Sequence, residues 1–109
     1  MSRPRWLFLC GKNLRRSPTA AAIYANDPRV DVRSAGVSPQ SRRIVTERDL
    51  DWATLLVVME RKHAARLRDR FPRRPLPTVV SLDIEDAYEL MDEELIERIR
   101  QGCELLLEG

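Results

Sequence analysis

Four short apolar segments alternate with helical stretches along the chain, and this alternation limits the fold more than any other feature. Three of them span residues 6–9, 54–59 and 79–82, and in the fourth, Val30-Asp31-Val32, apolar and polar residues alternate. Each is short, and its flanking polar and turn residues favour a strand over a buried helix. Helices are predicted over 19–26 after an opening Ser17-Pro18, over 46–51 with Thr46 and Asp49 as the cap, over 61–70, and after a cap at Asp92.

Regular alternation of strand and helix predicts an α/β fold, in which a parallel sheet carries helices on both faces. The chain has 109 residues, enough for one domain over 1–109 with a single hydrophobic interior but too few for a second domain. In such sheets, ligands bind beyond the carboxyl ends of the strands. Functional residues are therefore expected in the loops that follow the strands.

The cysteine content and the hydropathy favour the cytoplasm. The two cysteines, Cys10 and Cys103, lie 93 positions apart, which is a poor basis for a disulfide framework. The longest apolar run is Ala20–Ala25, which is too short to span a bilayer, and no secretory signal is recognisable. We expect a cytoplasmic protein with no membrane partner.

Charge is distributed unevenly along the chain. Residues 1–80 carry 17 Lys and Arg against 7 Asp and Glu, a net charge of +10, whereas residues 81–109 carry 2 against 10, a net charge of −8. The basic part favours anionic ligands, either phosphates or nucleic acid. Aromatic residues make up only 6% of the chain, too few to supply stacking platforms, so nucleic acid is not the expected partner.

The segment between the first strand and the first helix contains a nucleophile and an anion clamp at close spacing. Cys10 ends the strand, Arg16 follows six residues later where the helix begins, and Ser17 comes next. Backbone N–H groups before a helix N-terminus form an anion cradle, and the same positive dipole end stabilises a thiolate. Arg16 offers a planar fork for two phosphate oxygens, and the Ser17 hydroxyl can donate to the sulfur.

These residues resemble the active-site loop of the low-molecular-weight protein tyrosine phosphatases, whose pattern is Cys-x-Gly-Asn-x-Cys-Arg-Ser-Pro. The matching segment here is Cys10-Gly11-Lys12-Asn13-Leu14-Arg15-Arg16-Ser17-Pro18. Ser34-Ala35-Gly36, Val57-Val58-Met59-Glu60 with His63, and Ile84-Glu85-Asp86-Ala87-Tyr88 resemble later segments of that family. The resemblance implies a three-layer sandwich with strand order 2-1-3-4, and a compact bacterial subgroup fits the short chain best.

By this resemblance, Cys10 attacks phosphorus and Arg16 holds the oxygens of the transferred group. The phosphate-binding residues implied are Gly11, Lys12, Asn13, Leu14, Arg15, Arg16 and Ser17. The general acid is Asp86 by motif, with Asp83 at the end of the fourth strand as its rival. Tyr88 is either a wall for an aromatic substrate or a half-buried packing residue. His63 is expected to face solvent or cap a helix, and Cys103 to lie in the interior.

The chain departs from the family pattern at several positions. Ala87 replaces the proline after the acid, and Arg15 replaces the second loop cysteine, which removes the protective vicinal disulfide. Lys12 would add positive charge at the rim of the loop, and the alternative, which we favour, is a solvated lysine. Leu14 is aliphatic, as in tyrosine-type members, whereas phosphoarginine-type members carry threonine there, so the resemblance disfavours phosphoarginine.

The first functional hypothesis is a cysteine-dependent protein tyrosine phosphatase that acts on a phosphorylated protein or a small aryl phosphate through a cysteinyl-phosphate. It needs no metal or cofactor, and inorganic phosphate or sulfate is expected to bind in the loop. The alternatives are an arsenate reductase using the same loop, for which Cys103 would be a poor relay, and a non-catalytic phosphate or phosphopeptide binder.

Overall fold

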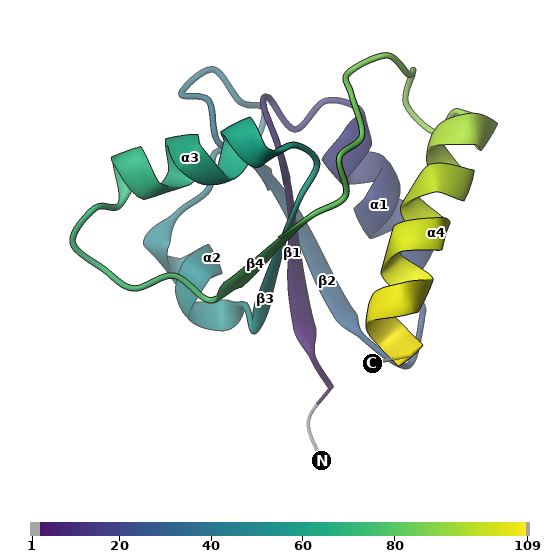
Figure 1. Cartoon of the computed structure of the whole chain (residues 1–109), viewed down its shortest axis with the longest axis horizontal. Coiled ribbons are helices and arrows are strands. Elements are labelled where there is room, and N and C mark those ends of the chain that lie inside the picture. The colour runs from purple at the N-terminus through teal and green to yellow at the C-terminus, as the bar shows by residue number, and fades with distance from the viewer. Residues whose placement is uncertain (1–2, 109) are drawn as a thin grey trace.

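The four predicted strands form one parallel sheet in the computed structural model, which describes residues 3–108 (Figure 1). They are β1 (Arg5–Cys10), β2 (Asp31–Gly36), β3 (Leu55–Val58) and β4 (Thr78–Ser81). The spatial order is β2-β1-β3-β4, and every neighbouring pair is parallel. The predicted α/β class and the strand order 2-1-3-4 are therefore confirmed.

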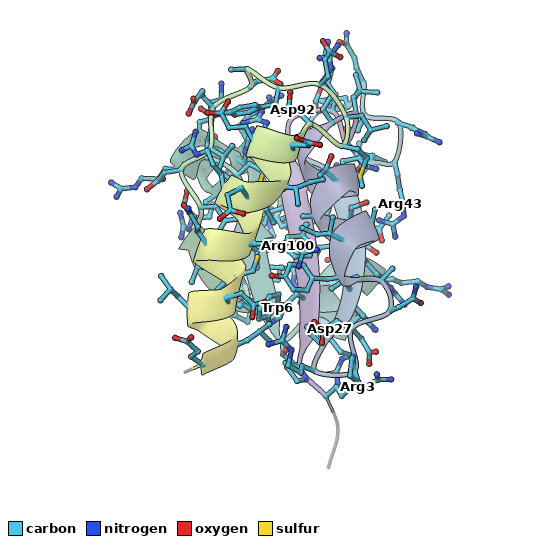
Figure 2. All side chains as sticks on the ribbon, turned by 90° about the vertical axis from the view of Figure 1, so that its right-hand side faces the viewer. Arg3, Trp6, Asp27, Arg43, Asp92 and Arg100 are labelled. Carbon is cyan, nitrogen blue, oxygen red and sulfur yellow. The ribbon has the colours of Figure 1, made fainter. Side chains whose placement is uncertain are left out.

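Helices cover both faces of this sheet and complete the predicted three layers. They are α1 (Arg16–Tyr24), α2 (Glu47–Trp52), α3 (Arg61–Arg70) and α4 (Glu93–Glu108). α1 and α4 lie on one face, and α2 and α3 on the other (Figure 1). In the perpendicular view, α4 and α1 run side by side in front of the sheet (Figure 2).

After Arg5, every residue of β1 is apolar and buried, and the two-sided packing of the sheet is the reason. The side chains of β1 alternate in direction, so Trp6 and Phe8 pack under α1 and α4, whereas Leu7 and Leu9 pack under α2 and α3. All four are at most 3% exposed. A parallel sheet covered on both faces buries both sides of its strands, which gives a continuous apolar run instead of an alternating one.

Two of the predicted caps are present as hydrogen bonds. The Asp49 amide donates to Thr46 Oγ1 at 3.3 Å, and the Thr46 amide donates to Asp49 Oδ2 at 2.9 Å, which makes a reciprocal capping box at the start of α2. Asp92 Oδ1 accepts from the amides of Glu94 and Leu95 at the start of α4. The caps place both helix starts where the sequence predicts them.

The first helix begins earlier than the sequence indicates. α1 starts at Arg16, three residues before the predicted start at Thr19, and Arg15 occupies the cap position without a side-chain cap bond. Ser17 therefore lies inside the first turn and does not cap it. Its hydroxyl is engaged by neighbouring side chains in the loop, as described below.

The carboxyl ends of the strands meet at one edge of the sheet, where the loops after β1 and β4 also lie (Figure 1). Asp92 marks this end of the molecule, and Asp27 lies toward the opposite end (Figure 2). Within residues 3–108, no helix is long and apolar enough to cross a membrane.

Candidate active site

Cys10 lies at the end of β1 with its thiol against a serine hydroxyl. It is 3% exposed, and its Sγ is 2.9 Å from Ser17 Oγ. The Ser17 hydroxyl also lies 2.9 Å from Asn13 Oδ1 as a donor. The thiol can donate to Ser17 while Ser17 donates to Asn13; once the thiol loses its proton, the hydroxyl can turn and donate to the sulfur. Ser17 is thus positioned to stabilise a thiolate.

The loop after Cys10 is held from one side by residues 37–42. The carbonyl oxygens of Cys10, Gly11 and Lys12 accept the amides of Val37, Ser38 and Arg42 at 2.9–3.0 Å. In a trans peptide the C=O and the following N–H point in opposite directions. The N–H groups of residues 11–13 consequently face away from residues 37–42.

These loop amides have no protein partner in the part of the chain that the structure describes. From residue 11 to residue 15, no backbone N–H donates to a protein acceptor there. Asn13 adopts a left-handed conformation with φ 55°, which asparagine tolerates better than most residues. Successive N–H groups around such a residue form a concave surface that binds anions.

Arg16 is a buried cation held by two acceptors. Its residue exposure is 4%, and its Nη1 donates to Glu60 Oε1 at 2.5 Å and to the Ile84 carbonyl at 2.7 Å. Asp86 Oδ1 lies 3.8 Å from Nε. Burial alone would raise the pKa of Glu60, but the hydrogen bond and charge of Arg16 bring that pKa below its ordinary value. Glu60 is therefore the counter-ion that fixes the guanidinium.

A cavity of about 290 Å³ opens over this loop and gathers most of the predicted site residues. Its lining is Cys10, Gly11, Lys12, Leu14, Arg15, Arg16, Ser38, Lys62, His63, Arg66 and Asp86. Asn13 and Ser17 are buried, and Ser17 contacts both Asn13 and Cys10. The structure thus brings together every predicted site residue except Asp83.

The two candidate acids lie in different places. Asp86 lines the cavity beside Arg16. Asp83 lies outside it: its Oδ1 accepts from Ser81 Oγ at 2.7 Å and lies 3.8 Å from Arg61 Nε. The left-handed backbone of Asp83, with φ 55°, turns the chain at the end of β4. Geometry therefore separates two carboxylates that are only three positions apart in the sequence.

His63 is buried at the start of α3, so the alternative of a solvent-facing histidine is wrong and the capping alternative is confirmed. Its residue exposure is 1%, and its Nδ1 accepts from the Glu60 amide at 3.1 Å. Burial, with a contribution from the Arg16 charge, lowers the pKa of His63 to about 4. The imidazole is neutral at physiological pH.

Sequence reasoning missed Glu60, Ser38, Lys62 and Arg66 as parts of the site. Glu60 follows the carboxyl end of β3 directly, and a place at that edge is the feature that could have identified it. Lys62 and Arg66 lie on α3 and read in the sequence as ordinary solvated positions of a basic helix. Their place at the cavity depends on how α3 packs on the sheet.

Tyr88 and Cys103 pack in the interior on the α1–α4 side of the sheet. Tyr88 is half-buried against the α1–α4 side and accepts a hydrogen bond from Arg98 of α4 at 3.1 Å, in agreement with the packing alternative. It does not line the cavity. Cys103 is fully buried in the same interior, as expected, and burial raises the pKa of its thiol to about 12.

The known proteins that are similar to this chain include several phosphatases. No protein-family model matches the chain. A protein-arginine-phosphatase of Geobacillus stearothermophilus is 33% identical over 92 residues, and the match covers 62% of this chain and 62% of that protein. The matched part is therefore less than two thirds of the length of this curated relative.

Solved structures match over almost the full chain. The YwlE arginine phosphatase from Geobacillus stearothermophilus superposes with a TM-score of 0.68 at 27% identity, covering 96% of this chain and 88% of that one. SP-PTP, a low molecular weight protein tyrosine phosphatase from Streptococcus pyogenes, gives 0.73 at 16% identity, covering 96% and 91%. The chain therefore has the fold of the low-molecular-weight protein tyrosine phosphatases, and part of its sequence is similar to that of an arginine phosphatase.

Proposed function

We propose that this protein is a cysteine-dependent phosphatase that works through a phosphocysteine. The observation that carries the proposal is that Cys10, Arg16 and the loop residues between them, Gly11, Lys12, Leu14 and Arg15, line one cavity. Among residues 3–108, no protein acceptor binds a backbone N–H from residue 11 to residue 15. A tetrahedral phosphate needs a nucleophile on one side and donors around its remaining oxygens. The loop offers both within seven residues of sequence.

In the first step, the Cys10 thiolate attacks phosphorus, an S–P bond forms, and the bond from phosphorus to the leaving oxygen breaks. Asp86 gives its proton to that leaving oxygen, which departs as the alcohol. Arg16 and the loop amides hold the three non-bridging oxygens as charge develops on them. Glu60 positions Arg16 for this task.

In the second step, the Asp86 carboxylate takes a proton from water, and the water oxygen attacks the phosphocysteine. The S–P bond breaks, inorganic phosphate leaves, and the thiolate is restored with Ser17 as a hydrogen-bond donor. Asp86 regains the proton needed for the next turnover. Protons and electrons balance over the two steps without a metal or a redox partner.

For the substrate, we favour an aryl phosphomonoester such as phosphotyrosine. Leu14 is 46% exposed at the cavity, where its aliphatic side chain can contact a flat ring. A second candidate is phosphoarginine, because the curated relative at 33% identity is named a protein-arginine-phosphatase. For arsenate reduction, Cys103 is unsuitable, since a buried thiol with a pKa of about 12 supplies no thiolate for exchange.

The test of the nucleophile is phosphate release from para-nitrophenyl phosphate by purified protein. We expect turnover by the wild type and by Cys103→Ala, and a loss of at least about 1,000-fold in Cys10→Ser, which retains phosphate binding. Rapid quenching should trap a phosphorylated protein that Cys10→Ala, which has no acceptor atom at this position, does not form. If Cys10→Ser keeps turnover, or if the wild type binds phosphate but releases none, the proposal fails.

The two substrate classes are separated with one peptide carrying either phosphotyrosine or phosphoarginine. Wild type should have the higher kcat/KM on phosphotyrosine, and Leu14→Thr should shift the ratio toward phosphoarginine. A wild-type preference for phosphoarginine would replace the first candidate with the second.

A further inference from the structure

The mouth of the active-site cavity carries more positive charge than one phosphate group needs. Besides Arg16, four cationic side chains line it: Lys12, Arg15, Lys62 and Arg66. The one carboxylate in the lining is Asp86. A substrate phosphate would be held by the loop amides and Arg16. The other four cationic side chains would then be free to contact the rest of the substrate.

Most of this charge is not neutralised by the protein. Among residues 3–108, neither Lys12 nor Arg66 has a carboxylate within ion-pair distance. Lys62 Nζ lies 3.7 Å from Glu60 Oε1, an oxygen that already accepts from Arg16. Arg15 meets only Glu89, at 3.5 Å, whose side chain is 86% exposed. Exposed pairs of this kind are weak and easily exchanged for another anion.

The placement of Lys62 and Arg66 concentrates the charge. They are four residues apart on α3, so they lie on the same side of the helix, an arrangement of like charges that disfavours the helix slightly. The acidic C-terminal helix cannot offset them, because α4 packs on the opposite face of the sheet (Figure 1). The mouth therefore stays cationic in the folded protein.

We propose that this mouth is a second anion subsite, and that it selects phosphopeptides with Asp or Glu next to the phosphorylated residue. The proposal rests on the phosphatase function above and names its substrate class. Carboxylates flanking the phosphate can reach Lys62 and Arg66 while the phosphate occupies the loop. A nucleic acid is a poorer fit, because no aromatic side chain lines the cavity to stack a base.

The test compares three phosphotyrosyl peptides. One has acidic residues beside the phosphotyrosine, one has the same residues moved to its far end, and one has neutral residues throughout. At low salt, we expect kcat/KM for the first peptide to exceed that for the other two by about fivefold, because two partly exposed pairs each contribute a small factor. The preference should fall toward unity at 0.5 M NaCl.

Variants then locate the subsite. The double variant Lys62→Gln/Arg66→Gln should reduce the preference to below about twofold. The matched control is Arg68→Gln/Arg70→Gln, which removes the same two charges from the same helix but outside the cavity lining, and it should keep the preference. Equal rates on all three wild-type peptides, or an equal loss in the control, would overturn the proposal.

Binding of the same peptides to Cys10→Ser, measured by fluorescence anisotropy, keeps this test independent of turnover. If the wild type releases no phosphate but Cys10→Ser prefers the first peptide, the phosphatase function fails and the anion subsite stands. Tighter binding of a 3′-phosphorylated oligouridylate than of an acidic phosphopeptide of equal net charge would overturn the peptide assignment.

Discussion

At the scale of the residue, the site depends on how single side chains share their hydrogen-bonding capacity. Ser17 serves both Cys10 and Asn13, and Arg16 is divided between Glu60 and the Ile84 carbonyl. Asp86 is the one carboxylate that both lines the cavity and has room to move, since its side chain is 57% exposed. The proposed acid, Asp86, and the proposed anion clamp, Arg16, are therefore distinct groups that lie beside each other.

Asp86→Asn should slow phosphotyrosine hydrolysis by about 100-fold, because an amide cannot protonate the leaving oxygen. The loss should be smaller for para-nitrophenyl phosphate, whose leaving group needs less help from an acid. Asp83→Asn is the control and should change either rate by less than about threefold. A larger effect of Asp83→Asn would reverse the assignment of the acid.

His63 should make the folded state sensitive to mild acid. Its pKa is about 4 when folded, against an ordinary value of 6.5, chiefly because of burial. Below pH 6.5 the unfolded chain binds a proton that the folded chain does not. The contribution of His63 to the free energy of unfolding is therefore fully present above pH 6.5 and is lost as the pH falls toward 4. Between pH 7 and pH 5 the free energy of unfolding should fall by about 2 kcal/mol from this group.

The variant His63→Gln isolates this effect, because its amide oxygen can accept from the Glu60 amide but does not titrate. Urea unfolding of both proteins at pH 7 and pH 5 gives the comparison. Asp49, whose pKa is also lowered but owes nothing of that shift to His63, contributes equally to both proteins. Parallel pH dependences would show that His63 does not titrate as described.

At the scale of the element, the segment after β2 supports the segment after β1. Gly36 has no room for a side chain: a Cβ there would lie 2.1 Å from Ser41 Oγ and 2.9 Å from the Gly11 carbonyl oxygen. Ser41 in turn donates to that same carbonyl at 3.0 Å. Because the Ser-Ala-Gly motif ends in a residue without a side chain, residues 37–42 can lie close enough to hold the Cys10 loop.

Gly36→Ala should lower kcat/KM by about 10- to 100-fold, because displacement of the supporting segment moves the loop amides away from the phosphate. The control is Gly102→Ala in α4, where the Cβ would meet only the tip of Leu82, at 2.6 Å, and that tip can rotate. Kinetics on para-nitrophenyl phosphate, with stability checked by urea unfolding, measures both. Wild-type kcat/KM in Gly36→Ala would contradict the supporting role.

At the scale of the whole molecule, two apolar interiors on opposite faces of one sheet should unfold as a single unit. Each face has its own tryptophan: Trp6 packs with the α1–α4 interior, and Trp52 packs against the α2–α3 interior. The strands are shared, so neither interior can persist when the other is lost. A single unfolding transition is therefore expected if residues 1–109 form one domain.

Single-tryptophan variants Trp52→Phe and Trp6→Phe should each show one urea transition whose fluorescence and circular dichroism midpoints coincide. Ile99→Val and Leu67→Ala lie on opposite faces, and should cost about 1 and about 3 kcal/mol. Their effects should add to within about 0.5 kcal/mol, because the sheet separates them. Non-coincident midpoints would indicate two units.

Strand and helix positions were predictable because they depend on local pattern. The capping pair Thr46–Asp49 and the apolar runs each act over a few residues. The sequence places the start of α1 three residues too far along the chain, because serine is a common N-cap residue. The Ser17 hydroxyl instead forms hydrogen bonds with Cys10 and Asn13. Tertiary hydrogen bonds outweigh a local preference there.

The sequence by itself determined the parallel α/β fold and the identity of the loop with Cys10, Arg16 and Ser17, since these features are encoded in spacing along a continuous segment. Only the tertiary structure decided which of Asp83 and Asp86 faces the cavity, that Glu60 holds Arg16, and that Lys62 and Arg66 stand at the mouth. These depend on where separate elements meet at the sheet edge. Contacts between separate elements follow from the packing of the whole interior, and the spacing of residues along the chain does not encode them.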